Sequence, residues 1–147
     1  MSLKPPFVAQ ERSDTCAIAC LRMLLAQQGI HVTEEEMVQE AKFEGYGIYI
    51  EELVRLAEHY GLRAEIQELD LAAIAELLAH GSYAIAYVDR TPLDGEFAIH
   101  TVIPIRISRR TVAFLDPLRG ERRVPRRTFD DAHRRLARAT VVCTPSR

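Results

Sequence analysis

An α+β fold is predicted by a change in hydrophobic periodicity near residue 80. Before that point, apolar residues recur mainly at the three- and four-residue spacing of helices. After it, short β-rich runs are separated by turn residues. Helices followed by an antiparallel sheet are typical of an α+β domain, with amino-terminal helices packed against a carboxyl-terminal sheet. The 147 residues are expected to form one domain, 1–147, with an extended entry segment at 1–9.

The first 80 residues are predicted to contain four helices and one short strand. Pro5-Pro6 favours extended backbone in the entry segment. Asp14 or Thr15 can cap the first helix, and Thr33-Glu34-Glu35-Glu36 has the pattern of a capping box for the second. The predicted helices span about 16–28, 34–42, 50–60 and 71–79, the strand spans 62–66, and a turn is expected at 45–47.

The remaining residues are predicted to form most of the sheet. Turn signals occur at Pro92, at Asp94-Gly95 and at 108–110. Val124 indicates a further short strand. The other predicted strands span 83–88, 97–103, 105–107, 111–115 and 139–143, and a helix is expected over 128–136.

Composition indicates a cytoplasmic protein without a membrane span. No apolar run approaches the roughly 20 residues that a membrane helix requires. The opening residues lack the apolar stretch of a secretory signal. The three cysteines are an odd number, and two of them lie four residues apart on a predicted helix. This pattern argues against a disulfide framework and favours reduced thiols.

The charge is distributed unevenly along the chain. Residues 1–100 hold 17 acidic and 7 basic residues, whereas 101–147 hold 4 acidic residues and 12 arginines. One interpretation is a solvated surface whose two halves attract each other within the fold. The other is a basic patch that docks an acidic peptide or a nucleic acid. Nucleic acid is the weaker alternative, because no aromatic residues interleave with the arginines to stack on bases.

Cys16 is predicted to lie in the first turn of its helix, where it could act as a nucleophile. Unpaired backbone N–H groups and the helix dipole stabilise a thiolate there and lower the thiol pKa. Cys20 lies one turn later within the apolar stripe, and Cys143 lies in the last predicted strand, so both are expected to be inert core thiols. A buried structural cysteine is the alternative interpretation of Cys16.

Three further residues could complete a thiol-protease site with Cys16. His100 lies in an apolar strand, although a hydrogen-bonded core histidine is the alternative; none of the other four histidines lies on a predicted strand. Asp116 ends a strand 16 residues later, and adjacent antiparallel strands could place it beside His100. Gln10 lies six residues before Cys16, and its amide could donate to an oxyanion.

Neither a metal nor a cofactor is predicted. No Cys/His pair has the spacing of metal ligands, and the sequence contains no glycine-rich phosphate loop.

Jointly, these residues resemble the bacteriocin-processing double-glycine leader peptidases, a family of papain-like cysteine proteases. The similarity runs from Gln10 to about Val142. It comprises the Gln-x5-Cys start with its apolar helix, Gly47-Ile48-x-x-Glu51-x-Leu53-x-x-Leu56-Ala57-x-x-Tyr60-Gly61-Leu62, His100-Thr101-Val102-Ile103 and Leu115-Asp116-Pro117-x-x-Gly120.

The resemblance implies a papain-like fold and a set of residue roles. Cys16 would be the nucleophile, His100 the general base and acid, Asp116 the residue that orients the imidazole, and Gln10 an oxyanion-hole donor. Cleavage would follow a Gly-Gly pair held in a narrow groove beside Cys16. The family has Asp-Cys-Gly at the nucleophile, whereas this chain has Thr15-Cys16-Ala17, in which alanine still permits a close helix start.

The leading hypothesis is a stand-alone cytosolic cysteine peptidase that cleaves a peptide or protein after small residues. Family members are often domains of an exporter, and no membrane or nucleotide-binding domain is attached here, so a separately encoded exporter is the expected partner. One alternative is a non-catalytic docking module that binds a secretion substrate or leader peptide. Another is an acyl or amide transferase on the same scaffold.

Overall fold

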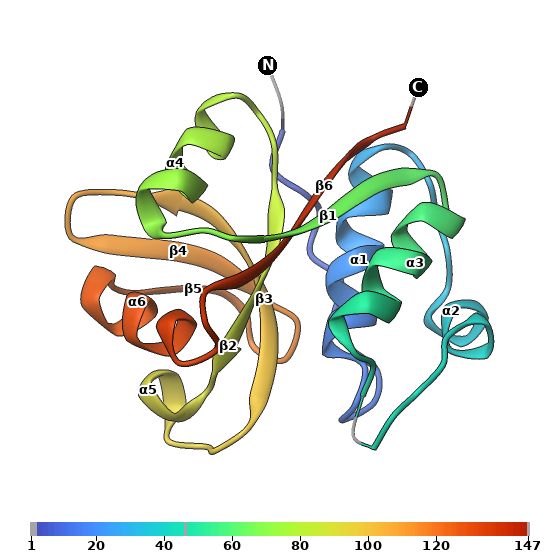
Figure 1. Cartoon of the computed structure of the whole chain (residues 1–147), viewed down its shortest axis with the longest axis horizontal. Coiled ribbons are helices and arrows are strands. Elements are labelled where there is room, and N and C mark those ends of the chain that lie inside the picture. The colour runs from blue at the N-terminus through green and yellow to red at the C-terminus, as the bar shows by residue number, and fades with distance from the viewer. Residues whose placement is uncertain (1–2, 46, 147) are drawn as a thin grey trace.

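The computed structural model describes residues 3–45 and 47–146 (Figure 1). Tyr46 lies outside the described residues, so the turn predicted at 45–47 is only partly described. In the described segments, the helices are α1 (Cys16–Gln27), α2 (Glu34–Glu40), α3 (Ile50–His59), α4 (Leu71–Ala79), α5 (Thr91–Asp94) and α6 (Arg126–Arg134). The strands are β1 (Leu62–Glu68), β2 (Ala84–Asp89), β3 (Ile99–Ile107), β4 (Thr111–Asp116), β5 (Gly120–Pro125) and β6 (Ala139–Pro145).

The strands form one six-stranded sheet in the order β1-β6-β2-β3-β4-β5, and every neighbouring pair is antiparallel. The fold is therefore α+β, as predicted. Figure 1 shows α1, α2 and α3 gathered on one side of the molecule and α4, α5 and α6 on the other. The strand β1 follows α3 in the chain but lies at the sheet edge beside β6, so the first half contributes to the sheet as well as the helices.

Two apolar cores stabilise this arrangement. The larger lies between α1–α3 and the sheet and includes Leu21, Leu56 and Ile85, each fully buried. The smaller lies on the other side, where Phe114 of β4 packs against Phe129 of α6 with ring centroids 5.4 Å apart. Burial of such side chains supplies most of the stabilisation available to a domain of this size. The first core holds α1 against β3, and this contact positions the site described below.

Three predictions need correction. The strand predicted from Phe97 begins at Ile99, and Phe97 is 91% exposed. The runs predicted as separate strands at 97–103 and 105–107 form one strand, because a bulge between Pro104 and Arg106 absorbs the proline that cannot donate to the ladder. The turn expected around Pro92 contains the one-turn helix α5, with Pro92 in its first turn.

The boundaries of the predicted helices differ from those observed by at most two residues, and α4 matches its prediction at both ends. The helix α6 begins at Arg126 rather than 128, and α2 ends at Glu40 rather than 42. The predicted capping box is half observed, since the Thr33 hydroxyl accepts from the Glu36 N–H at 3.1 Å. None of the helices in the described ranges is long and apolar enough to cross a membrane.

Candidate active site

Cys16 is the first residue of α1, as predicted. Thr15 is the N-cap residue, but its hydroxyl does not cap the helix. Instead it accepts from the Arg12 N–H at 3.1 Å and donates to the Arg12 carbonyl at 3.0 Å, which closes a tight turn before the helix. The first-turn N–H groups of α1 therefore receive no side-chain cap, and Cys16 stands at the positive end of the helix dipole.

His100 and Asp116 are side by side. The antiparallel register of β3 and β4 pairs Ile103 with Leu115, which brings the start of β3 next to the end of β4. His100 Nε2 lies 2.8 Å from Asp116 Oδ1, and the two side chains are 5% and 2% exposed. The same carboxylate oxygen accepts from the Leu118 N–H at 2.9 Å. Burial raises the pKa of Asp116, but the hydrogen bond and charge of His100 together with hydrogen bonds from Leu118 and Arg122 outweigh it, so its pKa is lowered.

The Cys16 thiol interacts with the same imidazole ring. Burial raises the pKa of this thiol, but hydrogen bonding to His100, the charge of His100 and hydrogen bonds from Thr101 together lower it. Burial opposes a charge on His100, yet hydrogen bonds to Asp116 and Cys16 raise the pKa of His100 to about 9. Nε2 of the ring faces Asp116, so Nδ1 is the nitrogen that remains for another partner. The electrostatics therefore favour a thiolate beside an imidazolium.

The other two cysteines lie in environments that disfavour a thiolate. Cys20 is fully buried, and its Sγ lies 3.6 Å from the Thr101 hydroxyl. Burial raises the pKa of the Cys20 thiol well above its usual value and raises the pKa of Cys143 to about 12. All three cysteines are free thiols. Cys16 alone among them combines partial exposure with a lowered pKa.

Gln10 lies in the segment before α1 and is tied to the neighbourhood of Asp116 through its backbone. Its N–H donates to the Pro117 carbonyl at 3.0 Å, and its side-chain Nε2 donates to the Arg12 carbonyl at 2.8 Å. The following residue is also held, because the Glu11 N–H donates to the buried carboxylate of Glu34 at 3.0 Å. The side chain of Gln10 thus makes no hydrogen bond to the other three predicted site residues, although one of its amide hydrogens is still available.

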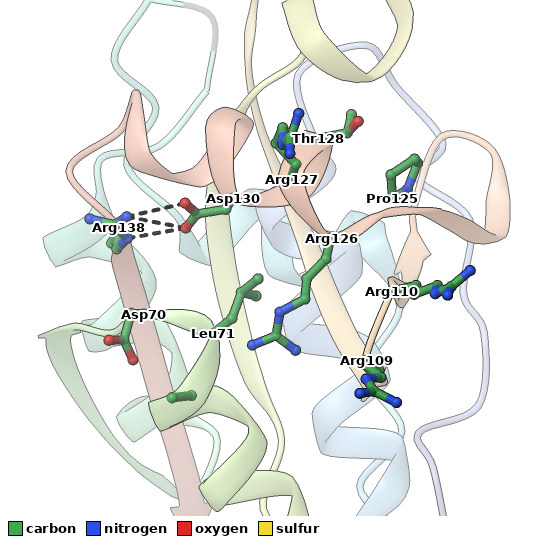
Figure 2. A pocket seen from close by; sticks show the side chains of 11 residues that line it. Asp70, Leu71, Arg109, Arg110, Pro125, Arg126, Arg127, Thr128, Asp130 and Arg138 are labelled. Carbon is green, nitrogen blue, oxygen red and sulfur yellow. Dashed lines mark hydrogen bonds and ion pairs between the residues drawn. The ribbon is translucent and has the colours of Figure 1, made fainter.

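Five of the carboxyl-terminal arginines gather around a pocket that contains none of the four predicted site residues. The pocket has a volume of about 830 Å³ and is lined by arginines from the β3–β4 turn, the start of α6 and Arg138. Figure 2 shows these side chains and the ion pair between Arg138 and Asp130. Other arginines bond acids of the first hundred residues, as in Arg135–Asp89 at 3.4 Å and Arg119–Asp94 at 3.4 Å. These contacts agree with the interpretation that the two halves attract each other, and docking of an acidic partner stays a prediction.

Comparison with known proteins identifies the family to which the chain belongs. The model of the Peptidase C39 family matches residues 4–144. The chain belongs to the Peptidase C39 family. It is therefore a cysteine peptidase by family, and the C39 match includes all four residues that sequence analysis singled out.

Solved C39 structures share the fold of this chain. A C39-like peptidase from Bacillus anthracis has a TM-score of 0.79 and 21% identity, over 95% of this chain and 94% of that one. The peptidase domain of Streptococcus ComA, a bi-functional ABC transporter, has a TM-score of 0.79 and 15% identity over 95% and 97% of the two chains.

A third C39 relative is a double-glycine-motif protease from an AMS/PCAT transporter, solved in complex with the leader peptide. It has a TM-score of 0.74 and 20% identity over 97% and 93% of the two chains. At these identities the likeness establishes the papain-like fold of the C39 chain. None of the curated proteins compared matches the chain.

Sequence reasoning missed two residues of this C39 site. Thr101 contacts both thiols on α1, and Arg122 contacts Asp116. Thr101 lies two residues before Ile103, so strand alternation places both on the β3 face that packs against α1, but no motif distinguished Thr101. Arg122 is one of 12 arginines in the last 47 residues, and only the strand register singles it out.

Proposed function

We propose that this C39 peptidase hydrolyses a peptide bond after small residues, of the Gly-Gly leader type, through Cys16, His100 and Asp116. Gln10 would supply an oxyanion-hole donor. The observation that supports this proposal best is the buried 2.8 Å contact between His100 Nε2 and Asp116 Oδ1, with the Cys16 thiol at the same ring.

The geometry supports a two-step mechanism. His100 accepts the Cys16 proton, and the thiolate sulfur bonds to the carbonyl carbon of the scissile peptide. The oxyanion is held by N–H groups at the start of α1 and by the Gln10 amide. His100 then protonates the leaving amine as the C–N bond breaks. A water molecule, deprotonated by His100, attacks the thioester and releases the acid with regeneration of the thiol.

The substrate proposal draws on the relatives and on exposed apolar residues. One relative was solved with a leader peptide, and another is a domain of an ABC transporter. In this chain Phe97 and Ile99 precede His100 and are 91% and 68% exposed, so they can contact a peptide beside the site. We therefore propose a leader-type peptide as substrate and an exporter as a partner. A cytosolic, single peptidase domain over 1–147 is part of this proposal.

Selective alkylation tests whether Cys16 is an activated thiol. Iodoacetamide at neutral pH is expected to modify Cys16 at least about tenfold faster than Cys20 or Cys143, because only Cys16 has a lowered pKa. Peptide mapping by mass spectrometry over time gives the three rates. The buried thiols are internal controls, and equal slow labelling of all three would contradict the proposed nucleophile.

Peptide cleavage tests the proposed substrate class. Incubation with a library of Gly-Gly and Gly-Ala peptides, followed by mass spectrometry, is expected to yield products cut after the small pair. Selective labelling of Cys16 without any cleavage would instead favour the docking alternative. Product formed only when an amine acceptor is added would favour the transferase.

Replacing Gln10 with alanine is expected to lower kcat by about 10²–10³-fold with little change in KM, because an oxyanion donor acts mainly in the transition state. Steady-state kinetics on a cleaved peptide give both constants. The matched control is Gln67→Ala, which removes an exposed amide bonded only to Glu65 on β1. A fall in kcat of the same size in both variants would argue against the oxyanion role.

A further inference from the structure

Arg122 of β5 lies directly behind the candidate catalytic carboxylate. The β4–β5 register pairs Phe114 with Arg122, so Arg122 projects on the face that also carries Asp116. Its Nη1 donates to Asp116 Oδ2 at 3.1 Å, and its guanidinium lies 5.6 Å from the centroid of the Phe114 ring. The Arg122 side chain is only 20% exposed. This position is unusual for arginine and requires partners that compensate for its burial.

The same guanidinium also holds the connection that leads to His100. Arg122 Nη2 donates to the Leu93 carbonyl at 3.2 Å, and Nη1 lies 3.9 Å from Asp94 Oδ2. Asp94 in turn is held by Arg90 at 3.2 Å and by Arg119 at 3.4 Å. Leu93 and Asp94 belong to α5, between β2 and β3. One planar group therefore joins β5, the end of β4 and the segment before β3.

We infer that Arg122 is a positioning residue for the catalytic set, which fixes the Asp116 carboxylate so that Oδ1 faces the His100 ring and anchors α5 to the site. This inference rests on the proposed function for the role of Asp116.

The two oxygens of Asp116 show why this role is needed. Oδ1 accepts from His100 and from the Leu118 N–H, whereas Oδ2 is held by Arg122. Without the contact at Oδ2, only the two hydrogen bonds at Oδ1 resist rotation of the carboxylate about its Cβ–Cγ bond, and the imidazole is oriented less firmly. Arginine suits the position because its fork can bond the carboxylate and the Leu93 carbonyl at the same time.

Removing the Arg122 charge is expected to raise the pKa values of nearby titratable groups. The charged groups that contact it are Asp116 of β4 and Asp94 of α5. Asp116 in turn contacts His100 of β3, whose ring interacts with the Cys16 thiol of α1, and Asp94 contacts Arg90 and Arg119. Loss of a fixed positive charge stabilises the protonated form of every neighbour. Formation of the Cys16 thiolate and deprotonation of His100 should both shift to higher pH.

The test is the pH dependence of Cys16 alkylation by iodoacetamide in Arg122→Gln. The midpoint of the rate curve is expected to shift upward by roughly half a pH unit to one unit. Turnover of a cleaved peptide should fall about tenfold, mainly in kcat. The matched control is Arg119→Gln, since Arg119 also contacts Asp94 but its side chain is half exposed and does not touch Asp116. In that control, the alkylation rate of Cys16 is expected to depend on pH as in the wild-type protein.

The conservative variant Arg122→Lys separates charge from geometry. It is expected to keep the wild-type pH curve and to lose part of the turnover, because an ammonium group lacks the fork that reaches Leu93. If Arg122→Gln does not fold, as judged by thermal unfolding, Arg122→Lys carries the test, and wild-type turnover in it would overturn the positioning role.

Two other outcomes also overturn the inference: a folded Arg122→Gln with the wild-type curve, or an equal shift in Arg119→Gln. Alkylation requires no peptide substrate. A protein that labels at Cys16 but cleaves nothing would contradict the proposed function while leaving this readout intact.

Discussion

Cys16→Ala is expected to lower cleavage by about 10⁴–10⁶-fold while leaving the fold intact, because no other described thiol can replace the nucleophile. Cys20 and Cys143 are buried with raised pKa values. Alanine fits the first turn of α1 without steric conflict and has high helix propensity. The measurements are product formation by mass spectrometry and the midpoint of thermal unfolding, with the wild-type protein assayed in parallel.

The matched control for this substitution is Cys143→Ala, which removes a thiol from β6 outside the site. It is expected to retain cleavage and to lose about 1 kcal/mol of stability, since a small buried side chain is shortened. Cleavage that persists in Cys16→Ala would refute the thiol mechanism. Unchanged partner binding in Cys16→Ala, together with a wild-type protein that cleaves no peptide, would identify a docking module instead.

Asp116→Asn is expected to reduce kcat by about 10³–10⁴-fold, because an amide cannot orient and stabilise the imidazolium as a carboxylate does. It should also change the pH profile. The hydrogen bond and charge of Asp116 contribute to the His100 pKa of about 9, so their loss lowers that pKa. The alkaline limb of activity, where His100 loses its proton, should move below pH 9. A pH series of kcat measures this shift.

The control for Asp116→Asn is Asp130→Asn, which breaks an ion pair with Arg138 in the arginine-lined pocket. It is expected to leave kcat and the alkaline limb unchanged, since surface pairs contribute little and lie far from the ring. An Asp116→Asn protein with the wild-type alkaline limb would show that the carboxylate does not set the charge of His100. Thermal unfolding of both variants separates misfolding from loss of chemistry.

Local patterns in the sequence predicted the elements that carry the site. Helical periodicity placed α1 at about 16–28, one residue longer than observed. The apolar run ending at Asp116 predicted β4, and its last residue proved to be the one that meets His100. Predictions of this kind succeed because side-chain periodicity follows directly from which face of an element is buried.

Local patterns failed at several places. Of the two predicted cap residues, Asp14 and Thr15, Thr15 takes the N-cap position, but its hydroxyl bonds the Arg12 backbone three residues earlier and does not cap the helix. The break expected between residues 103 and 105 is absent, because the register with β4 continues across the bulge at Pro104. The partners of Gln10 were likewise beyond prediction, since Pro117 lies more than a hundred residues away in the sequence.

The sequence by itself determined which residue types were available for thiol chemistry and on which elements they stand: a cysteine opening a helix, a histidine in a strand and an aspartate ending the next. Only the tertiary structure decided that the last two bond at 2.8 Å, that Cys16 alone among the three thiols has a lowered pKa, and that Arg122 is the arginine behind Asp116. The physical reason is that periodicity encodes burial along a single element. Hydrogen bonds and pKa values depend instead on packing and register between segments that are far apart in the chain.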